Sequence, residues 1–136
     1  MATIFVAYGD HDGRESVLAF AAERAAASGD DLYVYHAQDG DDETPDAVRE
    51  EVAAVVERTA PDVACETVVD VPDEETDRTN VSTQKRLLDA ILGSDHEFAY
   101  VVMGNVERGA VERFVIPSMT EAVLESRGVP VVLVPV

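Results

Sequence analysis

The stretch FAYVVMG, Phe98–Gly104, is an apolar run that predicts a buried strand over Phe98–Met103 with a glycine at its end. A long polar loop, Asn105–Ile116, follows, and then a predicted helix over Ser118–Arg127 and a last apolar strand, VPVVLVPV. Parallel α/β sheets bind phosphates where strand ends meet helix starts. The loop is longer than most connections in a small domain, which is typical of a functional or a disordered segment. It holds one internal glycine, Gly109, whereas a tight phosphate cradle would have several.

Three further strands are predicted before this stretch. TIFVAYG, Thr3–Gly9, is almost continuously apolar, which is typical of a central strand buried on both faces of a parallel sheet. The other two strands are expected at Leu32–Ala37 and at Ala64–Val71.

The helices between these strands are predicted from the signals at their ends. The first begins with a D-x-x-E capping box, Asp12–Glu15, and extends to Gly29. The second begins at Thr44-Pro45, a cap followed by proline, and extends to about Ala60; the third covers Ser82–Leu92 and stops at a glycine. The order βαβαβαβαβ predicts parallel strands joined by right-handed crossovers. We therefore expect one domain over residues 1–136, an α/β three-layer sandwich with a five-stranded parallel sheet and four helices.

The composition is strongly acidic. The chain has 28 Asp and Glu residues against 10 Lys and Arg residues, which gives a formal net charge of -18. Binding to a nucleic-acid backbone needs clustered basic residues, so nucleic acid is disfavoured as a partner. The acidic excess is spread over every predicted helix and therefore predicts a solvated acidic surface, a salt-loving source and a fold that requires salt. No apolar run approaches the ~18 residues of a membrane span, so we expect a soluble cytoplasmic protein without a membrane partner.

Several segments together resemble the universal stress protein family: the first strand with its acidic turn, the LYVYHA strand (Leu32–Ala37), the VVMG strand end and the final PVVLVPV. The resemblance implies a parallel sheet with strand order 3-2-1-4-5, of the adenine-nucleotide alpha-hydrolase-like type. It also implies a homodimer formed through the C-terminal strand, and ATP binding in some members. With that order, Gly9-Asp10 and Gly104 would flank the topological switch point, where ligands bind in such sheets.

The loop after Gly104 departs from the motif of the ATP-binding members. Their motif has the form G-x2-G-x9-G-[ST], and alignment from Gly104 places Glu107 and Pro117 at the second and third glycines and Ser118 at the hydroxyl position. Proline has no N–H to donate, and a glutamate carboxylate repels a polyphosphate. We therefore expect ATP binding to be impaired, and Mg²⁺ to bind only if ATP binds.

The resemblance also implies which positions would contact a nucleotide. The family places an aspartate just after the first strand, a position that is Gly9 here, with Asp10 one residue later, and the backbone of Ala37 would face a base. The candidate nucleotide-binding residues are Gly9, Asp10, Ala37, Met103, Gly104, Gly109, Arg113, Ser118 and Met119.

Several residues that could take part in binding or chemistry are also explained by a structural role. Ser118 begins an S-x-x-E capping box, which explains the residue without a ligand. The adjacent residues Asp10–Asp12 are unsuited to converge on one metal ion, and no metal site is predicted. Cys65 lies in an apolar run and is expected to be a small core residue.

Three functions remain open at this stage. The favoured one is a binding or regulatory module of the stress response rather than a catalyst, since the chain has no G-x-S-x-G or G-x4-G-K-[ST] motif. The alternative is a nucleotide switch or weak ATPase that uses Arg108, Gly109, Arg113 and Ser118 in place of the missing glycines. The third is an interaction scaffold whose dimer edge is the terminal strand.

Overall fold

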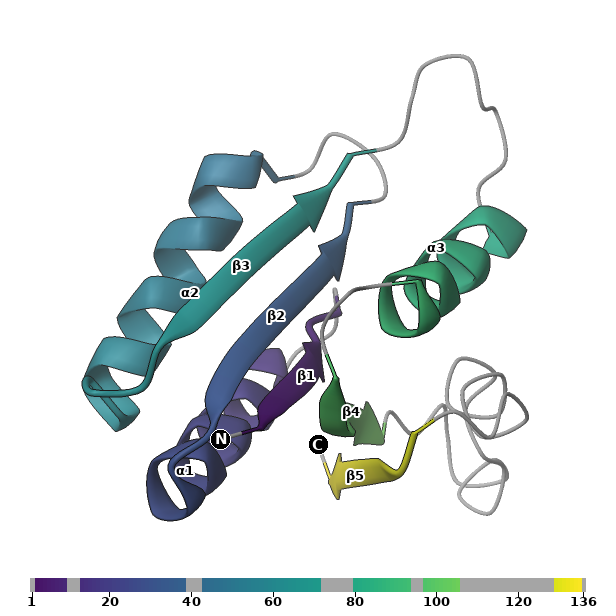
Figure 1. The fold of residues 1–136 in the computed structure, drawn as a ribbon. Helices are drawn as coiled ribbons and strands as arrows, with labels where there is room; N and C mark the ends of the chain where they lie inside the picture. Colours follow the sequence, from purple (N-terminus) through teal and green to yellow (C-terminus); the bar gives the residue numbers. More distant parts are fainter. Residues whose placement is uncertain are drawn as a thin grey trace.

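The computed structural model of the chain describes residues 2–9, 13–38, 43–71, 80–93, 97–105 and 129–135, with side chains throughout except at 80–85 and 105. Five parallel strands form one sheet in the order β3-β2-β1-β4-β5 (Figure 1), which confirms the order implied by the resemblance. The strands are β1 (Thr3–Ala7), β2 (Asp31–Ala37), β3 (Cys65–Asp70), β4 (Phe98–Asn105) and β5 (Val131–Pro135). The helices described are α1 (Arg14–Ser28), α2 (Pro45–Thr59) and α3 (Asn80–Leu92).

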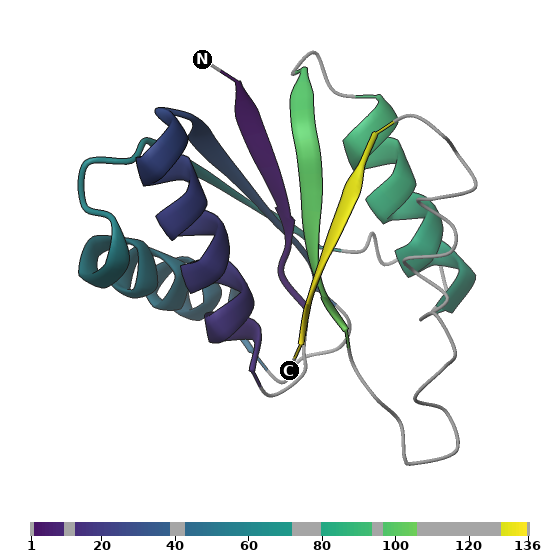
Figure 2. The same cartoon turned by 90° about the horizontal axis from the view of Figure 1, so that it is seen from below.

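The helices cover both faces of the sheet. Figure 2 shows α1 and α2 on one face and α3 on the other, so the molecule is the expected three-layer α/β sandwich. The predicted helix over Ser118–Arg127 and most of the preceding loop lie outside the described residues. No helix in the described ranges is both long enough and apolar enough to cross a bilayer.

Strand β1 occupies the centre of the sheet, as its continuous apolar run predicted. Ile4, Phe5 and Val6 are fully buried, and alternate residues of the strand contribute to two different cores. Ile4 and Val6 pack with the buried residues of α1 and α2, whereas Phe5 packs with Leu87 and Ile91 of α3. Phe5 also contacts three rings, because Tyr33, Tyr35 and Phe98 lie around it with centroids 5.5, 5.8 and 5.1 Å away.

The start of α2 follows the predicted signal. The Thr44 side chain accepts a hydrogen bond from the Ala47 amide at 3.1 Å, and Pro45 is the first helical residue. This pairing satisfies one of the amides that have no partner in the first turn of a helix.

The start of α1 differs from the prediction. The N-cap is Gly13, in a left-handed conformation with φ of 90°, and this residue makes no side-chain cap hydrogen bond. The amides of Ser16 and Val17 donate instead to the Gly13 carbonyl, at 3.0 and 3.3 Å. The predicted capping box, with Asp12 as N-cap, is therefore wrong. A glycine adopts positive φ without the steric cost that a Cβ would bring, so the chain enters the helix one residue later than the motif indicated.

Two strand ends also differ from the prediction. Strand β1 ends at Ala7 rather than Gly9, and β4 continues to Asn105 rather than Met103. Beyond β1, the Tyr8 carbonyl accepts a hydrogen bond from the ring of His36, with Nδ1 2.8 Å away. A carbonyl oxygen only accepts, so this contact places a proton on His36 Nδ1.

Candidate functional site

The carboxyl edge of the sheet has a step at β1. The last residues of β1 in register are Ala7, opposite Tyr35 of β2, and Val6, opposite Val102 of β4. Strand β2 continues for two residues past Tyr35 and β4 for three residues past Val102. At about 3.3 Å per residue, the two neighbours extend roughly 7 and 10 Å beyond the last residues paired with β1. We call this place, where Tyr8 and Gly9 leave the sheet between the longer ends of β2 and β4, the carboxyl-edge step.

The step coincides with the topological switch point of the sheet. The chain passes from β1 to β2 on one side, whereas β4 and β5 lie on the other side. In doubly wound α/β sheets, ligands bind outside the carboxyl ends of the strands where the order reverses in this way. The carboxyl-edge step therefore lies where ligands bind in sheets of this class.

Four of the predicted site residues lie at this edge. They are Gly9 after β1, Ala37 at the end of β2, and Met103 and Gly104 near the end of β4. Met103 is buried against the α3-side core, and Gly104 is half-buried. The other predicted residues lie outside the described residues: Asp10, Arg108, Gly109, Arg113, Ser118 and Met119.

Arg14, in the first turn of α1, is the main charged residue beside the step. Its Nη1 donates to the Gly9 carbonyl and to Glu43 Oε1, each at 3.0 Å, and its Nη2 donates to Glu43 Oε2 at 2.6 Å. Nη2 also pairs with the Glu51 carboxylate of α2. The guanidinium carbon lies 4.8 Å from the centroid of the Tyr8 ring. We call Arg14, the Gly9 carbonyl, Glu43 and Glu51 the Arg14 clamp.

The pairing of Arg14 with Glu43 shifts the pKa of both groups. The hydrogen bonds from Arg14 lower the pKa of Glu43 below its usual value, and Glu43 in turn raises the pKa of Arg14. Burial raises the pKa of the Tyr8 hydroxyl, and the nearby Glu51 carboxylate raises it further. The clamp therefore combines one guanidinium with two carboxylates, and it offers a ligand no uncompensated positive charge.

A second ionic cluster joins β2 and β3 to α3. Arg86 Nε donates to Asp70 Oδ2 at 3.1 Å, and its Nη2 donates to the Asp70 carbonyl. The Tyr35 hydroxyl donates to the same Asp70 Oδ2 at 2.5 Å. Burial raises the pKa of Tyr35, and the hydrogen bond to Asp70 adds to this rise. We call these residues the Arg86 cluster.

Gln38 connects the two clusters just beyond β2. Its backbone amide donates to the Asp70 carbonyl at 2.9 Å, and its backbone carbonyl accepts from Arg86 Nη1 at 3.4 Å. Its side-chain Nε2 donates to the Glu43 carbonyl at 2.5 Å. Gln38 is thus held by contacts from both faces of the sheet.

Sequence reasoning missed Arg14 and Arg86 as members of this edge. One feature of the sequence could have singled out Arg14. It is a cation in the first turn of a predicted helix, where the helix dipole disfavours positive charge. Its partners, however, are 29 and 37 positions away, beyond the reach of any local pattern.

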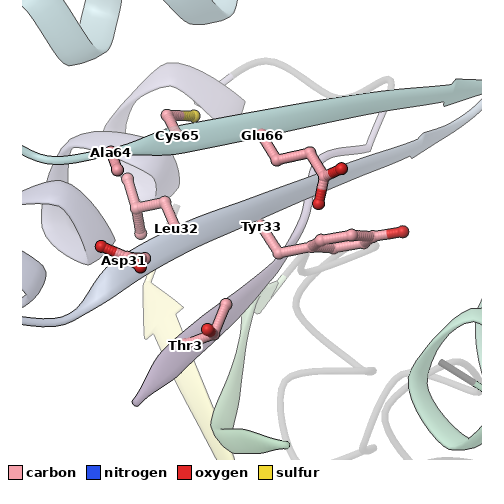
Figure 3. A pocket seen from close by; sticks show the side chains of 7 residues that line it. All are labelled: Thr3, Asp31, Leu32, Tyr33, Ala64, Cys65 and Glu66. Atoms are coloured by element: carbon pink, nitrogen blue, oxygen red, sulfur yellow. The ribbon is translucent and has the colours of Figure 1, made fainter. Parts of the chain in front are cut away.

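An open depression lies at the opposite end of the sheet. It has a volume of about 300 Å³. Figure 3 shows its lining residues: Thr3, Asp31, Leu32, Tyr33, Ala64, Cys65 and Glu66. Burial raises the pKa of the Cys65 thiol, so its reactive thiolate form is disfavoured. Cys65 is partly buried and packs against the edge of the α1–α2 core, so its prediction as a core residue is confirmed only in part.

No group of three metal-ligating side chains comes together in the part of the chain that the structure describes.

The sequence matches one known protein family over almost its whole length. The sequence model of the universal stress protein family matches residues 1–135. The chain belongs to the universal stress protein family. This membership confirms the resemblance recognised in the sequence, and it accounts for the strand order and for the switch point at β1.

Solved structures of the family have the same fold. A universal stress protein solved in complex with cAMP is 20% identical, with a TM-score of 0.66 and 98% of this chain and 95% of that chain covered. The Archaeoglobus fulgidus universal stress protein solved in complex with dAMP is 20% identical, with a TM-score of 0.59 and coverages of 98% and 97%. UspA from Lactobacillus plantarum is 18% identical, with a TM-score of 0.66 and the same coverages. No curated protein sequence matches the chain significantly.

Proposed function

We propose that this universal stress protein is a binding or regulatory module that holds an adenine nucleotide at the carboxyl-edge step, with impaired binding of ATP. The observation that carries the proposal is the short β1 between the longer β2 and β4, with Gly9, Ala37 and Gly104 around it at the switch point. Two relatives were solved with cAMP and with dAMP, nucleotides that carry a single phosphate.

The end of β2 supplies a backbone edge suited to a base. The Tyr35 carbonyl faces β1, since it accepts from the Tyr8 amide at 2.8 Å. Backbone groups two residues apart in a strand point to the same side, so the Ala37 backbone faces the space beyond the paired part of β1. An amide and a carbonyl in that position match the donor and acceptor on the edge of adenine.

Charge at this edge favours a ligand with few phosphates. Arg14 is paired with two carboxylates and Arg86 with one, so the two clusters contribute two positive and three negative charges. A triphosphate carries more negative charge than a monophosphate and is repelled more strongly by this excess. Glu107 and Pro117, which lie outside the described residues, replace two glycines of the family's phosphate loop and support the same conclusion.

Calorimetric titration in molar potassium chloride tests the proposal. AMP and cAMP should bind at least about tenfold more tightly than ATP with Mg²⁺, a difference of about 1.4 kcal/mol. The variant Gly104→Val adds a branched side chain beside the step and should weaken AMP binding, whereas Thr3→Val at the other end of β1 should not. Absence of binding by all three nucleotides would refute the proposal. Micromolar binding of ATP with Mg²⁺ would instead support the nucleotide switch.

We also propose that the protein forms a homodimer through β5. Strand β5 is the last strand of the sheet, so its outer backbone groups have no strand partner within the described residues. Its Leu133 side chain is 37% exposed. Light scattering in molar salt should give the mass of a dimer, and the variant Leu133→Pro, which removes an outward-facing backbone N–H of β5, should give a monomer. A monomeric mass for the wild type would remove this proposal.

A further inference from the structure

The Arg14 clamp connects three segments that border the carboxyl-edge step. Arg14 begins α1, Gly9 follows β1, and Glu43 lies directly before the cap of α2. Glu51 adds a contact to the second turn of α2. One side chain thus fixes the chain that leaves β1 relative to the chain that enters α2, and Gln38 ties the end of β2 to the same point through the Glu43 carbonyl.

Helix energetics alone do not explain an arginine at this position. A cation in the first turn is unfavourable beside the positive end of the helix dipole. The Arg14 side chain is only 12% exposed, lies over the Tyr8 ring and makes a bidentate pair with Glu43. Buried bidentate pairs are among the strongest hydrogen-bonded contacts and are screened less by salt than exposed pairs are. The tertiary contacts therefore offset the local cost.

Another arginine of the chain shows what a surface pair looks like. Arg49 reaches Asp46 at 3.5 Å within α2, and the two side chains are 49% and 91% exposed. Such pairs contribute little to stability and link no separate segments. Arg49 therefore provides a matched control for Arg14.

We infer that Arg14 is a positioning residue for nucleotide binding, which sets the distance between the Gly9 carbonyl and the end of β2 across the step. The inference rests on the proposed function. Arg14 acts through Gly9 and Glu43 rather than through contact with the ligand, because its described hydrogen bonds go to the protein. Loss of the guanidinium releases the segments that contain Gly9 and Glu43. Part of the binding free energy is then used to order these segments, and the affinity falls.

Calorimetry with AMP in molar potassium chloride tests this inference on four proteins: wild type, Arg14→Ala, Arg14→Lys and Arg49→Ala. All titrations are made well below the thermal midpoint of each variant, so that folded protein is compared with folded protein. Arg14→Ala should bind AMP at least about tenfold more weakly. Arg14→Lys keeps the charge but lacks the planar fork, and should also bind more weakly. Arg49→Ala should bind like the wild type.

A readout without ligand separates this inference from the proposed function. Hydrogen exchange of the free protein should be faster in Arg14→Lys than in wild type, in peptides that cover Gly9 and Glu43. If the wild type does not bind AMP, the proposed function fails and the inference fails with it. If the wild type binds AMP and the folded Arg14 variants bind equally well, Arg14 has only a structural role and the inference alone is overturned. If Arg14→Ala does not fold, Arg14→Lys and the isosteric Glu43→Gln decide between the same outcomes.

Discussion

The two ends of the sheet are stabilised in different ways. At the carboxyl edge, Arg14 and Arg86 join strand ends to helices through side chains, and Gln38 connects the two clusters. At the amino edge, Asp30 accepts from the Ala2 amide at 3.0 Å and from the Ser28 hydroxyl at 2.7 Å, on exposed and partly buried surface. The depression at that end is lined by two acidic residues and no basic one.

The difference indicates which end of the sheet is better suited to bind a ligand. A site must hold its groups in place before the ligand arrives, and partly buried ion pairs between side chains do this better than exposed hydrogen bonds. The carboxyl edge has such contacts on both faces of the sheet, around a strand that ends early. The predictions below test this contrast, in order of decreasing expected effect.

The largest effect is expected from Arg14→Ala. It leaves Glu43 and Glu51 without their shared cation and should reduce the free energy of unfolding by about 2–3 kcal/mol. Asp30→Ala at the amino edge should cost less. Urea denaturation in molar potassium chloride measures both, and an equal loss for the two variants would contradict the contrast between the ends.

A smaller effect is expected from salt. Self-repulsion of the net charge of -18 is screened in molar salt, so the thermal midpoint should rise by at least about 5 °C from dilute buffer to about 1 M potassium chloride. The deficit of Arg14→Ala should persist at high salt, because the Arg14 clamp is partly buried. Calorimetric scans check both statements. Equal midpoints at the two salt levels would refute the predicted salt requirement.

Tyr35→Phe tests the Arg86 cluster. It removes the hydroxyl that donates to Asp70 and should reduce stability by about 1.5 kcal/mol, the lower end of the range for a hydrogen bond to a charged group, because Asp70 keeps Arg86 as a partner. Arg49→Ala serves as the reference surface change, with an expected effect within about 0.5 kcal/mol. A Tyr35→Phe variant as stable as wild type in urea would show that this cluster does not hold the edge.

The smallest effect concerns pH. Pairing with Arg14 lowers the pKa of Glu43 in the folded protein, so the pair stabilises the fold above the unfolded pKa of about 4.5. This contribution is lost as the pH falls through the lower folded pKa. The stability difference between wild type and Glu43→Gln should be at most about 1 kcal/mol at neutral pH and should shrink below pH 4.5. A difference that grows on acidification would contradict the assigned pairing.

Much of the fold could be predicted from local patterns. The nearly continuous apolar run at Thr3–Gly9 identified the central strand, and Thr44-Pro45 identified the start of α2, since both signals lie within a few residues. The strand order came from the family resemblance. The capping box at Asp12 was wrong because a glycine beside it takes the N-cap at positive φ.

The candidate site could be predicted only in part. Gly9, Ala37 and Gly104 were predicted because the family resemblance implies nucleotide contacts at strand ends, and the apolar runs locate those ends. The Arg14 clamp and the Arg86 cluster could not be predicted in this way, because their ion pairs join residues that are 16 to 37 positions apart in the sequence. Early termination of β1 was also missed, since Tyr8 and Gly9 continue an apolar run that has no stop signal at Ala7.

The central claim is that an adenine nucleotide binds at the carboxyl edge of the sheet. The most direct test is a titration of isotope-labelled protein with AMP in molar potassium chloride, followed by the backbone amide signals in NMR spectra. The account predicts the largest shifts at Gly9, Ala37 and Gly104, with Thr3, Asp31 and Cys65 almost unchanged. Shifts centred on Thr3, Asp31 and Cys65, or no shifts at saturating AMP, would contradict it.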